Sequence, residues 1–278
     1  MAIYNRSVIR HRFAVVGFVL ATAVSLVLVA MRAISPARTE CFLLSELGVG
    51  PIRREPSSGC AIRVTPASTF KIPHALAALD SGVIEGPDTR LDYDGTPVTF
   101  ESWRHDHTLA SAMQSSVVWY FQRIATRLGM EREREYLRRL EYGNQDPSSG
   151  LTSFWLGGSL KISPDEQQVF LSKLYQDALP VSPRAKEIVR AILVQPEGKV
   201  VNAAGTHDFG APWPPGTIVS AKTGSDSAGA QSTRWIVGHV RRGTRSWIFV
   251  SAVTGKDLAP LAAVDLAAKA LHDQGVIR

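Results

Sequence analysis

The spacing of apolar and polar residues predicts a chain that begins with strands, continues with helices, and closes with strands and one more helix. The expected elements are strands at 41–50 and 60–65, a helix at 68–82, helices within 108–140, helices starting near 164 and 183, strands within 217–255 and a helix at about 259–273. Ser116 falls in the middle of an expected helix at 109–129, and the charged helix after it is expected to end near Gly143.

Segments rich in Gly, Pro and Ser separate these elements. Residues 50–59 are expected to connect the first two strands, and residues 195–217 are expected to form a long loop. By contrast, Ser163 stands directly before Pro164 and three residues before Glu166, which is the pattern of a helix capping box.

This order of elements favours an α+β fold, in which an antiparallel sheet is flanked by terminal helices and an all-helical subdomain of about residues 85–195 is inserted. The length of 278 residues suits one large domain, and the chain contains no internal repeat. We therefore expect a single folded domain at 38–278, preceded by a separate N-terminal segment at 1–37.

The N-terminal segment explains most of the positive charge. The formal net charge is +6, but residues 1–37 hold four arginines and no acid, which leaves 27 basic and 25 acidic side chains in the rest of the chain. Such a balance does not suggest a nucleic-acid-binding surface. Residues 13–31 carry no charge and are long enough to span a bilayer, and Ser35 and Ala37 follow in a cleavage pattern. We expect export to the periplasm, with this segment either cleaved as a signal peptide or retained as an inner-membrane anchor.

The two cysteines agree with export. Cys41 and Cys60 both follow the N-terminal segment, and an even number of cysteines in an oxidising compartment suggests a disulfide. The alternative is a pair of unbonded core thiols. No other cysteine is present and the seven histidines are scattered, so we expect no metal site. His105 and His107 are the closest histidines, and they fit a hydrogen-bonded turn better than a metal.

Ser68 and Lys71 stand three residues apart at the start of an apolar helix. Residues at this spacing share a helix face, and a serine needs an adjacent base to act as a nucleophile. A lysine can be that base only when burial keeps it neutral, and Phe70 and Ile72 provide apolar neighbours. Taken alone, the pair also fits an ordinary helix start with a capping serine and a surface lysine.

Other short motifs support the catalytic interpretation. They are, in chain order, Ser116-Val117-Val118, Tyr142-Gly143-Asn144, Trp155 in a polar loop, and Lys222-Thr223-Gly224 at the end of an expected strand. In the last motif, a lysine and a hydroxyl suit a substrate carboxylate, and a glycine permits close approach of the backbone. Together with the motif Ser68-Thr69-Phe70-Lys71, this set resembles the class D serine β-lactamases, the oxacillinase type of the penicillin-binding protein superfamily. The resemblance covers roughly residues 40–275.

The resemblance implies a hydrolase that opens the ring of penicillin-type β-lactams, which are small-molecule substrates. Ser68 would form an acyl-enzyme, and Lys71 would combine with carbon dioxide, supplied as bicarbonate, to become a carbamate. The carbamate would act as general base in both acylation and deacylation. Trp155 would donate its indole N–H to this group, Phe70 would help to keep its pocket dry, and no metal is implied.

The resemblance also assigns the surrounding positions. Backbone N–H groups of Ser68 and Ser225 would form the oxyanion hole. Ser116 would pass a proton toward the lactam nitrogen, while Lys222 and Thr223 would face the substrate carboxylate. The remaining assigned residues are two that limit access of water, Val118 and Leu156, and two that shape the pocket, Tyr142 and Asn144.

Three features depart from the family pattern. Ser225 follows Gly224 where many relatives have an aromatic residue. The family often has an arginine after the last strand to hold the substrate carboxylate, but here Lys256 is the nearest cation in that region. The segment 195–217 is long. These differences leave the range of β-lactams that the protein accepts unpredicted.

Three other functions use part of this pattern. A β-lactam sensor shares the motifs but stays acylated, and this chain has a single apolar span and no H-E-x-x-H segment. A cell-wall peptidase or transpeptidase would exclude the deacylating water, which disagrees with a pocket for a carbamate at Lys71. A non-enzymatic binding module would not need both lysines and Trp155. Sustained turnover of a β-lactam separates the hydrolase from all three.

Overall fold

The computed structural model describes residues 38–56, 60–227 and 231–278. Its strands are β1 (Thr39–Glu46), β2 (Gly50–Glu55), β3 (Arg90–Leu91), β4 (His107–Thr108), β5 (Lys199–Asn202), β6 (Gly205–Asp208), β7 (Thr217–Asp226), β8 (Ser232–Arg242) and β9 (Arg245–Gly255). Its helices are η1 (Ala67–Phe70), α2 (Lys71–Asp80), η2 (Glu101–Trp103), α3 (Leu109–Gln114), α4 (Val118–Arg139), α5 (Pro164–Tyr175), α6 (Pro183–Ile192) and α7 (Ala262–Asp273), where η marks a 3₁₀ helix.

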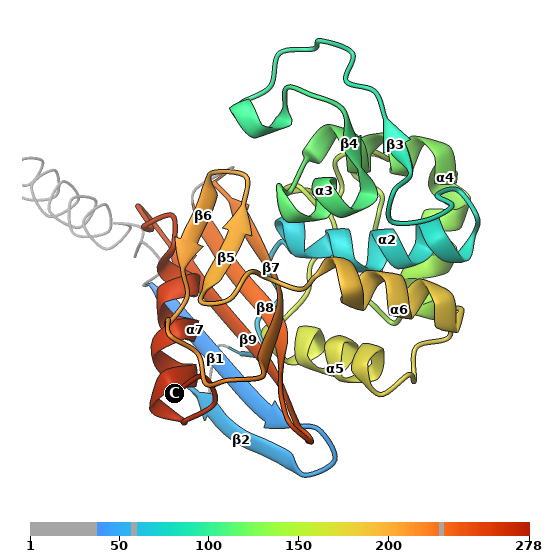
Figure 1. The fold of residues 1–278 in the computed structure, drawn as a ribbon. Coiled ribbons are helices and arrows are strands. Elements are labelled where there is room, and N and C mark those ends of the chain that lie inside the picture. The colour runs from blue at the N-terminus through green and yellow to red at the C-terminus, as the bar shows by residue number, and fades with distance from the viewer. Residues whose placement is uncertain (1–37, 57–59, 228–230) are drawn as a thin grey trace, which may run out of the picture. The chain divides into compact units, whose positions relative to one another are not determined.

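Five strands form one antiparallel sheet in the order β2-β1-β9-β8-β7 (Figure 1). Strand β7 lies at one edge and pairs with β8 along its whole length. Its outer side bonds to residues 193–195 near its start, but beyond Ala221 no strand of the described chain pairs with it. The second half of β7, which contains Lys222-Thr223-Gly224, therefore presents a free sheet edge.

Alternating side chains of the sheet enter two hydrophobic cores. On β8, Ile236 packs with the core beneath α7, whereas Trp235 and Val237 pack with the core that the other helices share. Figure 1 shows α7 on one side of the sheet and the helical part of the chain on the other. Side chains of one strand reach both cores because successive residues of a strand point to opposite faces of the sheet.

The predicted α+β class, with an antiparallel sheet and an inserted block of helices, is confirmed. Of the expected terminal helices, the described residues contain the C-terminal one, α7. The expected capping box is also present, because Ser163 and Glu166 exchange bonds with each other's backbone N–H at the start of α5. The domain boundary at residue 37 and the subdomain limits near 85 and 195 stay predictions.

Two strand predictions were wrong. The expected connection 50–59 contains strand β2, whereas the expected strand 60–65 makes only an isolated bridge between Val64 and Ile162. Most of the residues of β2 are exposed because it is an edge strand, so it lacks the alternation of a half-buried strand. The expected loop 195–217 contains the hairpin β5–β6, which is short and mostly polar.

The expected helix at 109–129 is interrupted. Helix α3 ends at Gln114 and α4 begins at Val118, and Ser116 between them has a φ of 55°. A positive φ is incompatible with a continuous right-handed helix, so the prediction that Ser116 lies in mid-helix was wrong. Helix α4 contains a second interruption at Gly129, whose φ of 77° and ψ of 160° are not helical.

Cys41 in β1 and Cys60 form a disulfide with 5.4 Å between their Cα atoms. It joins β1, the neighbour of the edge strand β2, to the segment that leads into η1. The predicted signal peptide or anchor, including residues 13–31, lies outside the described residues. Within the described ranges, no helix combines the length and apolar character needed to cross a bilayer.

Candidate active site

Ser68 lies in the 3₁₀ turn η1, one residue after Ala67, whose φ is 47°. This left-handed residue reverses the chain just before the serine, and α2 starts directly after the turn, at Lys71. The Lys71 Nζ lies 2.7 Å from the Ser68 Oγ. The spacing of three residues thus places the predicted base within hydrogen-bond distance of the predicted nucleophile.

Lys71 is fully buried, and no carboxylate in the described part of the chain forms an ion pair with it. Desolvation lowers its pKa well below the ordinary lysine value, and the nearby Lys222 ammonium lowers it further. The Nζ lies 5.4 Å from the centre of the Phe121 ring. Burial therefore favours the neutral amine of Lys71 far more than in an ordinary lysine, and the neutral amine is the state a base must have.

A cluster of aromatic side chains begins at Phe70, the residue directly before Lys71. Phe70 packs against Tyr142, Phe154 and Trp155, with ring centres 5.1 to 5.6 Å apart. The Trp155 side chain is completely buried, and its indole N–H has no hydrogen-bond partner. A buried unpaired donor is costly, so Trp155 marks a place where an acceptor group belongs.

Ser116 joins the helical part of the site to the sheet. Its Oγ lies 3.0 Å from the Nζ of Lys222, which also bonds to the carbonyl of Thr223 at 3.1 Å. The strained turn at Ser116 is supported by the indole of Trp103, which donates to the carbonyl of Ser115. Breaking the helix here turns the Ser116 hydroxyl toward β7.

Lys222 is buried like Lys71. Desolvation lowers its pKa to about 7, so near neutral pH it exchanges easily between the ammonium and the amine. A lysine in this state can accept or release a proton through the Ser116 hydroxyl.

Gly224 allows β7 to pack closely against the turn that carries Ser68. A Cβ added at this glycine would lie 3.0 Å from the Pro66 carbonyl oxygen and 3.1 Å from the Thr69 Cγ2. These separations are tighter than ordinary packing, so the site needs a residue without a side chain here. Thr223 and Ser225 point to the other face of the strand, because side chains alternate.

Tyr142 and Asn144 form hydrogen bonds with residues near the site. The Tyr142 hydroxyl accepts a bond from Gln167, whose amide also donates to Thr69 next to the nucleophile. The Asn144 side chain donates to the Ser159 carbonyl and accepts from the N–H of Lys161. Tyr142 thus binds the side chain of Gln167 and Asn144 binds backbone groups, while their pocket-shaping role stays a prediction.

Val118 and Leu156 are half-buried, and Leu156 packs against the core that contains Trp155. Val118 also lines a cavity of about 410 Å³ that continues over Trp103, Trp119 and Arg123. Ser68, Lys71, Ser116 and Lys222 do not line this cavity.

Arg234 is a candidate that sequence reasoning missed. It lies on β8 directly opposite Ser225, on the same face as Thr223, and is only 8% exposed. Its guanidinium donates to the backbone carbonyls of Asp226, Thr233 and Leu258 and to the Ser227 hydroxyl, the Asp226 carboxylate also interacts with it electrostatically, and its Nε is buried without a hydrogen-bond partner. The predicted cation Lys256 is exposed and follows the end of β9. Only the pairing of β7 with β8 reveals Arg234, which is ten residues from Gly224 in sequence.

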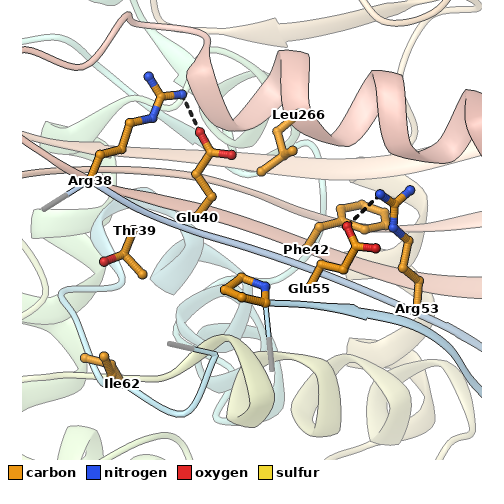
Figure 2. Close-up of a pocket in the computed structure, with 9 residues that line it drawn as sticks. Arg38, Thr39, Glu40, Phe42, Arg53, Glu55, Ile62 and Leu266 are labelled. Carbon is orange, nitrogen blue, oxygen red and sulfur yellow. Dashed lines mark hydrogen bonds and ion pairs between the residues drawn. The ribbon is translucent and has the colours of Figure 1, made fainter. Parts of the chain in front are cut away.

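A separate cavity of about 750 Å³ opens beside β1, β2 and α7. Figure 2 shows two ion pairs in it, Arg38 with Glu40 and Arg53 with Glu55. None of its lining residues belongs to the cluster around Ser68. Among the described residues, no group of three or more His, Cys, Asp or Glu side chains is placed to hold a metal ion.

Known proteins share this sequence and architecture. The family model described as the penicillin binding protein transpeptidase domain matches residues 53–272. A probable β-lactamase of Bacillus subtilis, YbxI, is 37% identical over 69% of this chain and 65% of its own length. The regulatory protein BlaR1 of Bacillus licheniformis is 33% identical over 77% of this chain and 33% of its own length. This chain thus spans less than two thirds of the length of these curated relatives.

Solved structures agree with the sequence comparison. The crystal structure of a class D β-lactamase from Bacillus subtilis superimposes with a TM-score of 0.76 at 32% identity. The alignment covers 87% of this chain and 93% of that one.

Proposed function

The chain belongs to the penicillin-binding protein transpeptidase family and, within it, to the class D β-lactamases, and from this premise we propose that it hydrolyses penicillin-type β-lactams through an acyl-enzyme on Ser68. The observation that carries the proposal is the buried amine of Lys71, whose pKa is lowered by desolvation, at 2.7 Å from the Ser68 hydroxyl. A serine beside such a base is the arrangement that nucleophilic catalysis requires.

The pocket at Lys71 fits carbon dioxide bound to the amine as a carboxylate. Desolvation lowers the pKa of the amine and so favours its neutral form, aromatic side chains lie next to it in the chain and in space, and the unpaired Trp155 N–H offers a donor for an anionic oxygen. Carbon dioxide on Lys71 supplies the general base for acylation and for hydrolysis. The protein contributes by excluding bulk water with Phe70 and by orienting the group with Trp155.

The other residues act on the substrate. The Ser68 Oγ attacks the lactam carbonyl, and the backbone N–H groups of Ser68 and Ser225 stabilise the negative oxygen. Ser225 can serve because it lies where the outer edge of β7 is unpaired. Ser116 passes a proton from Lys222 to the departing lactam nitrogen, a route supported by their 3.0 Å contact. Val118 and Leu156 restrict the approach of water.

The substrate carboxylate binds to Thr223, Lys222 and Arg234. The support for Arg234 is its position opposite Ser225 and its unpaired buried Nε. We expect Arg234→Met to raise KM for a penicillin at least tenfold with a smaller change in kcat, because a binding group for the carboxylate is lost. Lys256→Met is the matched variant and should leave KM unchanged. If Lys256→Met raised KM and Arg234→Met did not, Lys256 rather than Arg234 would bind the substrate carboxylate.

Turnover of a chromogenic cephalosporin or penicillin by residues 38–278 tests the proposal. The protein should turn over many equivalents, and added bicarbonate should increase the rate. Ser68→Ala should abolish product formation, and Lys71→Ala should lower kcat by about 10²–10⁴-fold, the usual contribution of a general base. Normal turnover by Lys71→Ala would eliminate the proposed base.

A β-lactam-sensing function is the second candidate, because the BlaR1 relative matches more of this chain than YbxI does. A sensor would give one equivalent of product and a stable acyl-enzyme. The same assay, followed by mass spectrometry of the intact protein, therefore distinguishes the two.

We also propose that the domain works outside the cytoplasm. The Cys41–Cys60 disulfide supports this location, since such bonds persist in oxidising compartments. The apolar segment 13–31 after three arginines supports export as well. Protease accessibility in intact cells and in spheroplasts would test the location.

A further inference from the structure

The contact between Ser116 and Lys222 joins two parts of the chain that are 106 residues apart in sequence. Ser116 lies in the turn after α3, and Lys222 lies on the edge strand β7. A proton moves between two such groups only when their heavy atoms lie within hydrogen-bond reach. The fold must therefore hold the end of α3 at a fixed distance from β7.

A short connector, residues 192–195, lies between these two parts. It begins with the last residue of α6 and leads toward β5 (Figure 1). The Leu193 carbonyl accepts a bond from the N–H of Ala221 at 2.9 Å, and the N–H of Gln195 donates to the Val219 carbonyl at 2.8 Å. The connector thus covers the outer edge of β7 up to the residue directly before the buried lysine of that strand.

Gln114, the last residue of α3, binds the connector from the helical side. Its Nε2 donates to the carbonyl of Ile192 at 2.7 Å and to that of Val194 at 3.0 Å. The last carbonyls of a helix lack partners within the helix, so they need donors from elsewhere. Gln114 supplies such a donor at the end of α6, and it lies two residues before Ser116 in the chain.

Gln195 binds the connector to the sheet. The residue is 7% exposed, and its Nε2 donates to the carbonyls of Leu193 and Ala221, both at 3.1 Å. Its Oε1 accepts a bond from the N–H of Val201 in β5 at 2.8 Å. This side-chain amide therefore holds the connector against β7 one residue before Lys222.

We propose that Gln114 and Gln195 are positioning residues, which through the connector hold the Ser116 hydroxyl against Lys222 and thereby set the rate at which Ser68 is acylated. Gln114 fixes the helical end of the 3.0 Å contact, and Gln195 fixes its sheet end. This inference rests on the proposed proton route from Lys222 through Ser116.

The balance of the reaction confines this role to acylation. When the Ser68 Oγ bonds to the lactam carbonyl carbon, its proton passes to the base at Lys71. The C–N bond of the ring breaks, and its electron pair stays on nitrogen. The nitrogen takes a proton from the Ser116 hydroxyl, which takes one from Lys222, and Lys222 regains its proton from solvent. Hydrolysis of the acyl-enzyme breaks an ester and releases no nitrogen, so it does not need this route.

Gln114→Met removes the amide and keeps the length of the side chain. Because Gln114 is half-buried, the variant should fold with a Tm close to that of the wild type. Stopped-flow mixing of excess 278-residue protein with a chromogenic cephalosporin measures acylation, and mass spectrometry of the intact protein measures decay of the acyl-enzyme. Acylation should slow about 10- to 100-fold and decay should stay within about twofold, because a displacement near 1 Å has effects of this size only on the step that uses the displaced group.

Gln122→Met is the matched control. Gln122 is also half-buried, and its Nε2 also donates to a backbone carbonyl, that of Thr152 at 3.1 Å, which lies outside the connector. Its acylation and decay should match the wild type. Gln195→Met loses three bonds to backbone groups, so it should slow acylation as Gln114→Met does and also lower Tm.

The pKa of Lys222 reports on the contact without any substrate. Desolvation lowers this pKa to about 7, and the neighbouring lysine, Lys71, stays in place in the variants. In Gln114→Met, water that enters between Ser116 and Lys222 should raise the pKa by about 1 pH unit or more, because desolvation is reduced. Carbon-13 NMR of labelled lysine side chains measures the titration, and the signal missing from Lys222→Met identifies the residue.

The outcomes distinguish the positioning role from the function on which it rests. Wild-type acylation in Gln114→Met, an unchanged pKa of Lys222, or equal slowing of acylation and decay would overturn the positioning role and leave hydrolysis through Ser68 standing. Slow acylation in Gln122→Met would overturn it as well. A wild-type chain that forms no acyl-enzyme at Ser68 would overturn the proposed function, and this inference with it.

Discussion

Lys222 shows how a single buried side chain links stability to chemistry. Burial lowers its pKa from 10.5 to about 7, so the unfolded chain binds this proton more strongly than the folded protein does. Between about pH 7 and 10.5 the free energy of unfolding should therefore rise with pH. Below pH 7 the full penalty for burying the lysine is present. Lys71 acts in the same direction.

Lys222→Met should remove the contribution of Lys222 to this pH dependence, leave that of Lys71, and stabilise the domain at pH 7. The gain should be a few kcal/mol, with about 5 kcal/mol as a ceiling, since one pKa unit corresponds to about 1.4 kcal/mol. Urea unfolding at pH 6, 7 and 9 measures it, with Lys269→Met on the surface of α7 as the control. Unchanged stability at all three pH values would show that Lys222 is not desolvated as the structure indicates.

At this scale, the sequence predicts residues that belong to short motifs and misses those that act through space. Ser68 and Lys71 are recognisable because helical spacing fixes their separation. The burial of Glu133 cannot be recognised in the sequence, because Glu133 is one of several similar charged residues. It is buried because the turn of α4 points its side chain toward the core. The position of Arg234 cannot be read from the sequence for another reason. It lies beside Ser225 only because β7 pairs with β8.

At the scale of elements, the close contact between β7 and η1 determines the geometry of the site. Gly224→Ala would place a methyl group against Pro66 and Thr69 and move β7 away from Ser68. We expect kcat/KM to fall about 10- to 100-fold, because displacements near 1 Å at a reacting centre have effects of this size. Steady-state kinetics measure the loss, and the circular dichroism spectrum should be unchanged.

Gly86→Ala is the control for this substitution. Gly86 has no positive φ, and an added Cβ would meet only the end of the Arg184 side chain at 3.7 Å. Its kinetics should match the wild type. Equal activity in both variants would mean that the glycine of this motif is not needed for close packing.

The elements themselves were predictable where periodicity was strong. Strands β7, β8 and β9 and helices α5 and α6 appear where apolar spacing and caps placed them. The break at Ser116 was not predictable, because the apolar positions on both sides continue the same helical spacing. Contacts from outside the segment, such as the bond from Trp103 to Ser115, support the local departure from helix.

For the whole molecule, the Cys41–Cys60 disulfide should contribute to stability without contributing to catalysis. Closing a loop of about 20 residues stabilises by about 3 kcal/mol through the unfolded state. Replacing both cysteines with alanine should therefore lower Tm by roughly 6–12 °C in a domain of this size. Differential scanning calorimetry checks the loss, and kcat at 20 °C should stay within twofold of the wild type.

Reductant provides the matched control. It should lower the Tm of the wild type to that of the double variant and leave the double variant unchanged. A double variant with the Tm of the wild type would assign the bond no stabilising role in the folded domain.

The contact between Ser116 and Lys222 has a consequence for how the chain can be divided. Ser68, Lys71 and Ser116 all precede the hairpin β5–β6, and Lys222 follows it. A cut at the turn between these two strands, near Ala204, which is exposed, leaves one fragment with the nucleophile and another with the second lysine. Neither fragment holds a complete site, so activity would appear only on reassembly. Fused to two other proteins, the halves would report whether those proteins meet.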